Sequence, residues 1–273
     1  MDFRSASQRV KERLVGLYLN DTRPGEIPWS VASGVLVAFA NRFFVFTSGH
    51  NLEHLAVRDI FLMFPRELLV VPWKGGQAIR EFWRSDDPDV AVIELEPADQ
   101  AYWNHMSPVE LDDFAASTAI APDSLLLIGG YPCQQTQPGR VDARADPASP
   151  PMFASAGLVA RVGLAQDARS PHEPSEGRGL HVIYHGDCFF DIDGLHQATL
   201  PAPEGLSGGP LLAINERRSL LLGLARAKHS APDLLEWYEP AFEALRLLVD
   251  HADLDVRSAV IGALEKLSPK GPA

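Results

Sequence analysis

Cysteine is scarce in this sequence of 273 residues, which contains only Cys133 and Cys188. Two cysteines are too few for a disulfide-stapled secreted scaffold or for a four-cysteine zinc site. Basic residues are also in the minority, because 24 Lys and Arg stand against 36 Asp and Glu, for a formal net charge of −12. Phosphate contacts need clustered Lys and Arg, so this balance argues against a general nucleic-acid binder. We therefore expect two free thiols and no nucleic-acid partner.

Long apolar runs are missing as well. The longest, such as Ser124–Gly129, have the length of a strand and fall far short of the roughly 18 apolar residues that a membrane span needs. The first residues, Met1–Ser7, contain neither an apolar stretch nor the small-residue cleavage site of a secretory signal. Together with the free thiols, these absences predict a protein of the reducing cytoplasm that contacts no membrane.

The sequence does contain short β-branched and aromatic runs, within a globular composition of 46% hydrophobic residues. Gly, Pro, Asp and Asn bound these runs, and long helical periodicity is missing before the C-terminal end. This pattern predicts an all-β barrel or sandwich. The expected strands are Val15–Leu19, two strands within Val35–Phe46 around a turn at Asn41 and Arg42, Asp59–Phe64, Glu67–Val71, Asp89–Leu95, Ser124–Ile128, Gly157–Leu164, His181–Tyr184, Pro210–Ile214 and Leu220–Ala225.

The remaining segments predict loops and two helices. Polar, proline-rich stretches at Gln134–Pro151 and Gln166–Gly179 are expected to be long surface loops, and Ala98–Pro122 to connect two β lobes. Glu239–His251 and Leu254–Leu267 carry apolar residues at helical spacing. The simpler interpretation docks both helices on the β core. The alternative makes them a contact surface for a regulatory protein partner.

The strongest chemical signal surrounds Ser207, in the run Gly205-Leu206-Ser207-Gly208-Gly209-Pro210. A nucleophilic serine needs an exposed hydroxyl and backbone N–H groups aimed at the position where an oxyanion forms. Glycines allow the tight bend that this requires. The same letters also occur in ordinary turns, so the motif alone does not decide.

Two further motifs place a base and a carboxylate at the ends of strands. His50 follows the apolar run Phe43–Phe46 in Thr47-Ser48-Gly49-His50. Imidazole suits a general base, because its ordinary pKa of about 6.5 lets it accept and return a proton near neutrality. Asp89 opens the run Asp89-Val90-Ala91-Val92, where a partly buried carboxylate can orient an imidazole. Each motif taken singly also fits a strand end with no chemical role.

Taken together and in this order, the three motifs resemble the trypsin-like (chymotrypsin-fold) serine peptidases of the bacterial intracellular type. Ser33-Gly34-Val35-Leu36-Val37 and Ile128-Gly129-Gly130-Tyr131-Pro132 add weaker matches. The resemblance covers roughly residues 15–228. It implies two six-stranded antiparallel β-barrels, with lobes at about 15–110 and 120–230 of a peptidase domain at 1–235, followed by a helical extension at 236–273.

The resemblance also implies roles for individual residues. Ser207 would attack the scissile carbonyl, His50 would move the proton, and Asp89 would hold the imidazole tautomer. The backbone N–H groups of Gly205 and Ser207 would form the oxyanion hole. The implied activity is that of a serine endopeptidase acting on a protein or peptide substrate, with neither a cofactor nor a metal.

Two departures from the family pattern bear on activation and specificity. Leu206 occupies the position where secreted trypsins carry an Asp that pairs with a new N-terminus, and the Ile/Val-Val-Gly-Gly start is missing. We therefore expect either an enzyme assembled as made or one switched by a partner or a loop. Pro201 stands at the expected base of the specificity pocket, so cleavage after Arg or Lys is not expected. The hypothesis for this pocket is that Arg226 or Lys228 recognises an acidic substrate side chain.

Three alternatives compete with this interpretation. His50-Asn51-Leu52-Glu53-His54 matches the His-x-x-Glu-His pattern of zinc peptidases, which requires a helix with both histidines on one face. The Ser207 motif matches the nucleophile elbow of α/β-hydrolases, which requires a strand before the serine and a helix after it. The third alternative is a peptidase-like binding module that is inactive until a partner engages it.

Overall fold

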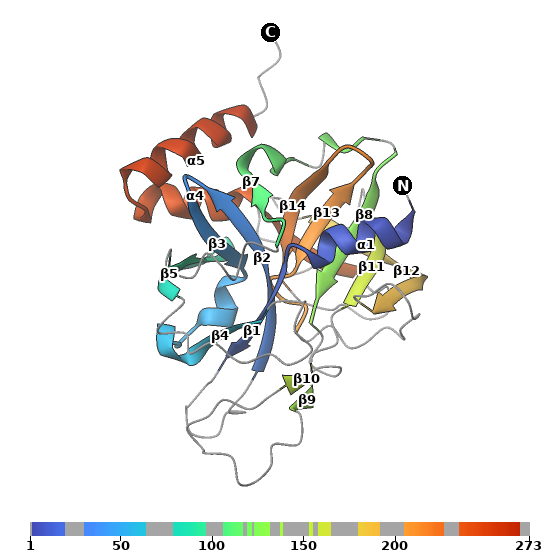
Figure 1. Ribbon diagram of the computed structural model, residues 1–273, viewed down its shortest axis with the longest axis horizontal. Coiled ribbons are helices and arrows are strands. Elements are labelled where there is room, and N and C mark those ends of the chain that lie inside the picture. Colours follow the sequence, from blue (N-terminus) through green and yellow to red (C-terminus); the bar gives the residue numbers. More distant parts are fainter. Residues whose placement is uncertain are drawn as a thin grey trace.

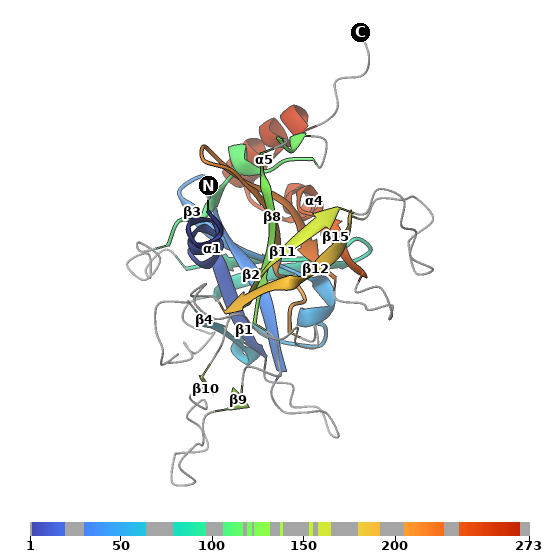
Figure 2. The same cartoon turned by 90° about the vertical axis from the view of Figure 1, so that its right-hand side faces the viewer.

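The computed structural model describes residues 2–19, 30–63, 79–96, 106–116, 119–121, 123–131, 137–138, 153–154, 158–164, 180–191, 205–226 and 235–267. Two lobes of antiparallel β structure lie against each other, and helices from both ends of the chain pack on them (Figure 1). The helix near the N-terminus lies on one side of the lobes and the two C-terminal helices lie on another (Figure 2). The described residues confirm the predicted, mainly antiparallel all-β architecture with a C-terminal helical segment. Of the two predicted six-stranded barrels, the second lobe is closed in this way, whereas the first is a seven-stranded curled sheet.

The first lobe is a curled sheet with the strand order β4-β1-β2-β3-β6-β5. Apolar side chains on alternate positions of its strands, such as Val15, Leu36 and Ile93, form one buried cluster. A two-residue turn at Ala40 and Asn41, both with positive φ, joins β2 to β3, as the twist of a tight hairpin requires. The strands are β1 (Leu14–Leu19), β2 (Ser30–Phe39), β3 (Arg42–Thr47), β4 (Ile60–Met63), β5 (Ile79–Asp86), β6 (Asp89–Leu95) and β7 (Val109–Glu110), the last of which pairs in parallel with β2.

The second lobe is a closed six-stranded barrel with the order β11-β12-β15-β14-β13-β8. Its interior contains Val162, Val182, Leu211 and Leu222, all buried. The strands are β8 (Leu125–Gly130), β11 (Leu158–Leu164), β12 (Leu180–Asp191), β13 (Pro210–Ile214), β14 (Ser219–Ala225) and β15 (Leu235–Pro240); β9 (Gln137–Pro138) and β10 (Phe153–Ala154) form a separate small pair.

The helix α1 (Phe3–Lys11) was not predicted from the sequence. Asp2 caps it by accepting a hydrogen bond from the Ser5 N–H at 2.8 Å. Its buried Val10 packs on Gly129 of β8, where a Cβ atom would lie only 2.5 Å from the valine methyl. Arg9 donates to the backbone carbonyl of Asn215 at 2.8 Å. The helix therefore holds the start of the first lobe against the second lobe.

The C-terminal helices α4 (Phe242–His251) and α5 (Leu254–Leu267) dock on the β core, as the simpler interpretation predicted. Leu245 and Leu248 of α4, and Val256 and Val260 of α5, are fully buried within the largest apolar cluster of the molecule. That cluster also contains residues of both lobes, so the helices stabilise the β structure by burying its outer apolar face. A regulatory partner at these helices stays a prediction.

The structure corrects the sequence prediction at several strands. β12 covers Leu180–Asp191, well beyond the predicted His181–Tyr184. β15 runs to Pro240, so the barrel extends past the expected domain boundary at residue 235, and Glu239 belongs to this strand rather than to the following helix. β5 was not predicted, because its exposed positions interrupt the apolar alternation that marks a buried strand. The expected strand Glu67–Val71 and most of the loops Gln134–Pro151 and Gln166–Gly179 lie outside the described residues. The predicted connection Ala98–Pro122 contains the short strand β7.

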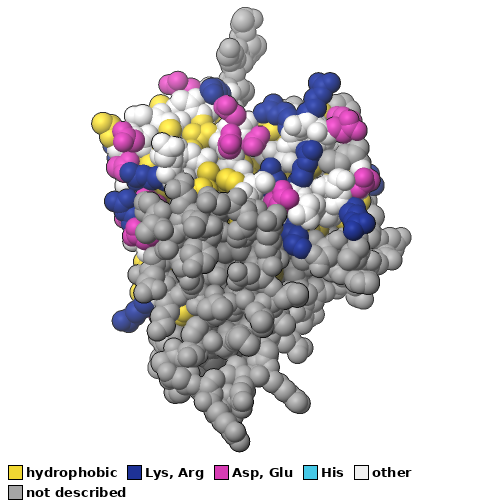
Figure 3. All heavy atoms as spheres, in the orientation of Figure 1, with side chains coloured by type: hydrophobic (Ala, Val, Ile, Leu, Met, Phe, Trp, Pro, Cys, Tyr) yellow, Lys and Arg dark blue, Asp and Glu magenta, His cyan; other side chains and the backbone are white. Residues whose placement is uncertain are grey.

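On the face shown in Figure 3, basic and acidic side chains are interspersed over the described part rather than gathered by sign. Among the described residues, no helix is both long enough and apolar enough to cross a membrane.

Candidate active site

His50 lies just beyond the end of β3, in a short 3-10 turn (η1, Gly49–Leu52). The chain there passes close to β5 and β6, because a Cβ atom at Gly49 would lie 2.2 Å from the carbonyl oxygen of Ser85 in β5 and 3.1 Å from Asp89 Oδ1 at the start of β6. Only glycine tolerates that approach. The His50 side chain is 44% exposed, so its ring borders on solvent while its backbone is held against the sheet.

Asp89 opens β6, and its side chain is only 5% exposed. The backbone N–H of His50 donates to Oδ1 at 2.8 Å, and Oδ2 lies 2.6 Å from Nδ1 of the same histidine. An ionised carboxylate can only accept hydrogen bonds, so it places the ring proton on Nδ1 and leaves Nε2 as an acceptor. Asp89 therefore orients both the backbone and the ring of His50.

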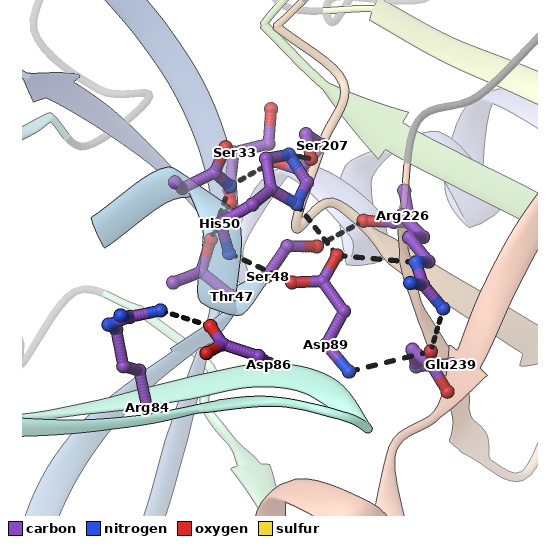
Figure 4. Close-up of polar contacts among 12 residues, drawn as sticks. Ser33, Thr47, Ser48, His50, Arg84, Asp86, Asp89, Ser207, Arg226 and Glu239 are labelled. Carbon is purple, nitrogen blue, oxygen red and sulfur yellow. Dashed lines mark hydrogen bonds and ion pairs between the residues drawn. The ribbon is translucent and has the colours of Figure 1, made fainter. Parts of the chain in front are cut away.

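Ser207 completes the arrangement from the second lobe. Its Oγ lies 2.6 Å from Nε2 of His50, on the side of the ring opposite to Asp89 (Figure 4). The hydroxyl can donate to the free ring nitrogen, which would then receive its proton. The structure thus brings the three residues predicted from separate motifs, Ser207, His50 and Asp89, into one hydrogen-bonded triad.

The loop that carries Ser207 sits directly on the first lobe. Gly208 has a φ of 82°, and a Cβ atom there would lie 2.0 Å from Thr47 Oγ1 and 2.2 Å from the Ser33 carbonyl oxygen. Gly205 also has a positive φ, of 95°. Both values fall in the region that glycine adopts readily and other residues rarely adopt. The glycines around the serine therefore serve the bend and the close approach of the two lobes.

Further hydrogen bonds fix the contact between the loop that carries Ser207 and the first lobe. The Gly208 N–H donates to the Ala225 carbonyl at 2.7 Å, and the Ser48 hydroxyl donates to that carbonyl at 2.5 Å. The Ser207 carbonyl accepts from the Ser33 N–H at 2.9 Å and from the Asn51 side-chain amide at 3.1 Å. Ser33 and Asn51 of the first lobe are thus bonded directly to the nucleophile's carbonyl, and Ser48 shares the Ala225 carbonyl with Gly208.

The predicted oxyanion donors, the backbone N–H groups of Gly205 and Ser207, lie on either side of Leu206. Leu206 is 1% exposed, and it packs so closely on Gly130 that a Cβ atom there would lie 2.6 Å from Leu206 Cδ2. The position that carries an Asp in secreted trypsins is therefore filled by apolar packing in this chain. The oxyanion hole itself stays a prediction.

Arg226, a predicted specificity residue, is paired with two acidic side chains of the structure. Its Nη1 lies 2.9 Å from Glu239 Oε1 and its Nε lies 3.7 Å from Asp89 Oδ2, so the guanidinium faces the carboxylates of both Glu239 and Asp89 (Figure 4). The sequence did not indicate this pairing, because the partner lies on another strand. Recognition of an acidic substrate group by Arg226 stays a prediction. Pro201 and Lys228 lie outside the described residues.

Glu239 is the residue of this site that the sequence prediction assigned to a helix. Its side chain is 3% exposed, and its Oε1 accepts a hydrogen bond from the Asp89 N–H at 3.5 Å. Burial raises the pKa of Glu239, while the Arg226 charge acts in the opposite direction. No motif signalled this residue, and only the register of β15 beside β14 brings it to the triad.

The two competing enzyme motifs do not have the geometry that they require. The zinc pattern needs a helix, but the chain after His50 forms a single 3-10 turn, and His54 adopts a positive φ of 65°. His54 lies 3.1 Å from Glu53. Within the described parts of the chain, no group of three or more His, Cys, Asp or Glu side chains is placed to hold a metal ion. The α/β-hydrolase elbow needs a helix after the serine, whereas the strand β13 follows Ser207.

Comparison with known proteins finds a likeness among solved structures but none among family models or curated sequences. Among solved structures, the chain is similar to the Rv3671c protease from M. tuberculosis in its active form, with 14% sequence identity and a TM-score of 0.49. The match covers 92% of this chain and 85% of that protease.

Proposed function

We propose that this protein is a trypsin-like serine endopeptidase that hydrolyses peptide bonds through an acyl-enzyme intermediate. The observation that carries the proposal is the continuous chain of contacts from Ser207 through His50 to Asp89, each at 2.6 Å. Two lobes and three separate strand ends contribute to this chain. An incidental cluster of polar residues would not reproduce both the order and the orientation of the groups.

In the proposed reaction, Ser207 Oγ bonds to the scissile carbonyl carbon while His50 Nε2 accepts the hydroxyl proton. The carbonyl oxygen becomes an oxyanion, which the N–H groups of Gly205 and Ser207 would stabilise. Collapse of this intermediate breaks the C–N bond, and His50 returns the proton to the leaving amine. A water molecule then hydrolyses the ester in the same way, with His50 as the base, and Ser207 recovers its proton. Asp89 stabilises the imidazolium formed in each step.

A serine-directed probe provides the decisive experiment. A fluorophosphonate should label the folded wild-type protein, and peptide mapping should place the adduct on Ser207. Ser207→Ala should abolish labelling and should lower hydrolysis of a peptide or ester substrate by several orders of magnitude. Ser258→Ala is the matched control, because Ser258 is an exposed serine of α5 whose hydroxyl donates only within its own helix.

The outcome also decides between the enzyme and the binding module. Folded wild-type protein that neither reacts with the probe nor hydrolyses any member of a mixed peptide library would favour the module that awaits a partner. A mixed library also tests specificity, because the proline at position 201 predicts no preference for cleavage after Arg or Lys.

A cytoplasmic location is part of the same proposal. It rests on a sequence with two cysteines in 273 residues, which cannot form the several disulfides that stabilise secreted trypsins. Titration of both thiols in freshly isolated, unfolded protein tests it, and a Cys133–Cys188 disulfide would contradict it.

A further inference from the structure

The contacts among Ser207, His50 and Asp89 do not by themselves fix the conformation of the serine loop, residues 205–209. Stabilising an oxyanion requires the N–H groups of Gly205 and Ser207 to point at one position. Gly205 has no Cβ and adopts a φ of 95°, so its own backbone restricts the loop little. Leu206 is apolar and can form no ion pair that would fix the loop. The Gly205–Leu206 peptide links these two N–H groups, so a contact that fixes its orientation also restricts theirs.

Ser33, a residue of β2 in the first lobe, contacts this peptide directly. Its Oγ donates a hydrogen bond to the Gly205 carbonyl oxygen at 2.6 Å and accepts one from the Tyr131 N–H at 2.8 Å. The residue is fully buried. The hydroxyl thus uses its one proton on the loop, while the neighbouring segment of the second lobe fixes its orientation.

The backbone of Ser33 binds the other side of the nucleophile. Its N–H donates to the Ser207 carbonyl at 2.9 Å, and its carbonyl accepts from Thr47 Oγ1 at 2.7 Å. One residue of the first lobe therefore donates to the carbonyls of both Gly205 and Ser207. The two bonds differ in origin, because only the bond to Gly205 depends on the Ser33 side chain.

The surroundings leave the hydroxyl no alternative position. A Cβ atom at Gly130 would lie 2.9 Å from Ser33 Oγ and 2.6 Å from Leu206 Cδ2, so the serine and the leucine fill the same narrow space above Gly130. Without the hydroxyl, the buried Gly205 carbonyl and Tyr131 N–H would both lose a partner. A buried polar group without a partner is unfavourable, and rotation of the Gly205–Leu206 peptide would relieve it.

We propose that Ser33 is a positioning residue whose hydroxyl holds the serine loop in the conformation that forms the oxyanion hole, so that no newly made N-terminus is needed. The assignment to catalysis rests on the proposed peptidase function. The hydroxyl touches neither the substrate nor the reacting atoms. It acts through the Gly205 carbonyl. In this chain, a neutral hydrogen bond between the lobes would thus take the place of the ion pair that secreted trypsins form with a new N-terminus.

The test compares Ser33→Ala with the matched control Ser219→Ala. Ser219 is also a buried β-strand serine, and its hydroxyl has no hydrogen-bond partner among the described residues. Hydrogen exchange should become faster in Ser33→Ala at Tyr131 and across residues 205–209, and should stay at the wild-type rate there in Ser219→Ala. The kcat of Ser33→Ala should fall by about 10- to 100-fold with KM changed by less than about threefold, since loss of one complete oxyanion donor costs about 10²- to 10³-fold.

The two readouts separate this proposal from the peptidase proposal. If the wild-type protein shows no hydrolase activity, the peptidase proposal fails, and faster exchange in Ser33→Ala still demonstrates that the hydroxyl holds the loop. Unchanged exchange at residues 205–209 overturns the proposal whatever the activity. In an active wild type, faster exchange with an unchanged kcat also overturns it, because Ser33 would then be structural only.

Discussion

Arg226 Nη1 lies 2.9 Å from Glu239 Oε1, and this ion pair borders the carboxylate of Asp89 that orients His50. The Glu239 side chain is 3% exposed and the Arg226 side chain is 23% exposed, so the acid is the more buried partner. A charge without its partner is far less favourable in such a place than the intact pair. The environment of the buried Asp89 carboxylate therefore depends on both residues.

Removing the arginine should destabilise the fold. Arg226→Ala leaves Glu239 buried beside Asp89, and we expect the free energy of unfolding to fall by about 3 kcal/mol, as for other buried pairs that lose one partner. Urea denaturation measures this change. Lys266→Ala is the control, since its pair with Asp112 is 71% and 77% exposed and should contribute less than about 1 kcal/mol. Equal effects of the two substitutions would contradict this account.

Replacing Asp89 tests its role in orienting the histidine. In Asp89→Asn, an amide N–H₂ can face Nδ1 in place of a carboxylate oxygen, which favours the wrong ring tautomer. We expect kcat to fall by about 10⁴-fold while the fold is kept. Asp86→Asn, at an 80% exposed side chain of β5, is the control and should retain activity within a few-fold. Steady-state hydrolysis of an ester substrate measures both variants.

Gly208 should not tolerate a side chain. In Gly208→Ala, the new methyl would lie 2.0 Å from Thr47 Oγ1 in a backbone with a φ of 82°, so the lobes would have to separate. We expect loss of probe labelling and a lower Tm. Gly262→Ala is the control, because a Cβ atom on this residue of α5 would meet nothing within 4 Å. That substitution should raise stability by about 0.5–1 kcal/mol, since alanine favours helix.

Glu94 should make stability depend on pH in the acidic range. Its side chain is 3% exposed, and burial raises its pKa above the ordinary 4.5, although Arg42 and Arg80 act in the opposite direction. The folded protein then binds this proton more tightly than the unfolded chain does. The contribution of this group to the free energy of unfolding is therefore fully present below the pKa of the unfolded chain, and it is lost as pH rises through the pKa of the folded protein. Urea denaturation at several pH values should show a decline across this window in the wild type that is smaller in Glu94→Gln; identical slopes would refute it.

Local patterns were sufficient for the elements whose signals lie within one segment. The strands Asp89–Leu95 and Pro210–Ile214 and the helix Leu254–Leu267 have the predicted bounds, because their apolar periodicity is continuous. His50, Asp89 and Ser207 were identified from three strand-end motifs. Their contact depends on the fold, and the structure supplies it.

The remaining parts of the site depend on contacts between distant segments. Arg226 meets Glu239 only because β14 pairs with β15, and the sequence assigned Glu239 to a helix instead. In the sequence, Ser33 stands out only as the first residue of a weaker match to the family pattern. Its hydrogen bond to the Gly205 carbonyl joins residues 172 positions apart, and no local pattern encodes such a pairing.

The contact between the two lobes limits how this chain can evolve or be divided into separate parts. His50 and Asp89 come from one half, Ser207 comes from the other, and the bonds from Ser33, Ser48 and Asn51 cross the same boundary. Either half alone, however well folded, would hold a base without a nucleophile or a nucleophile without a base. The proposed reactivity therefore depends on how the two halves are seated, and a displacement of about 1 Å between them would lower the rate by about 10²-fold with every residue still in place.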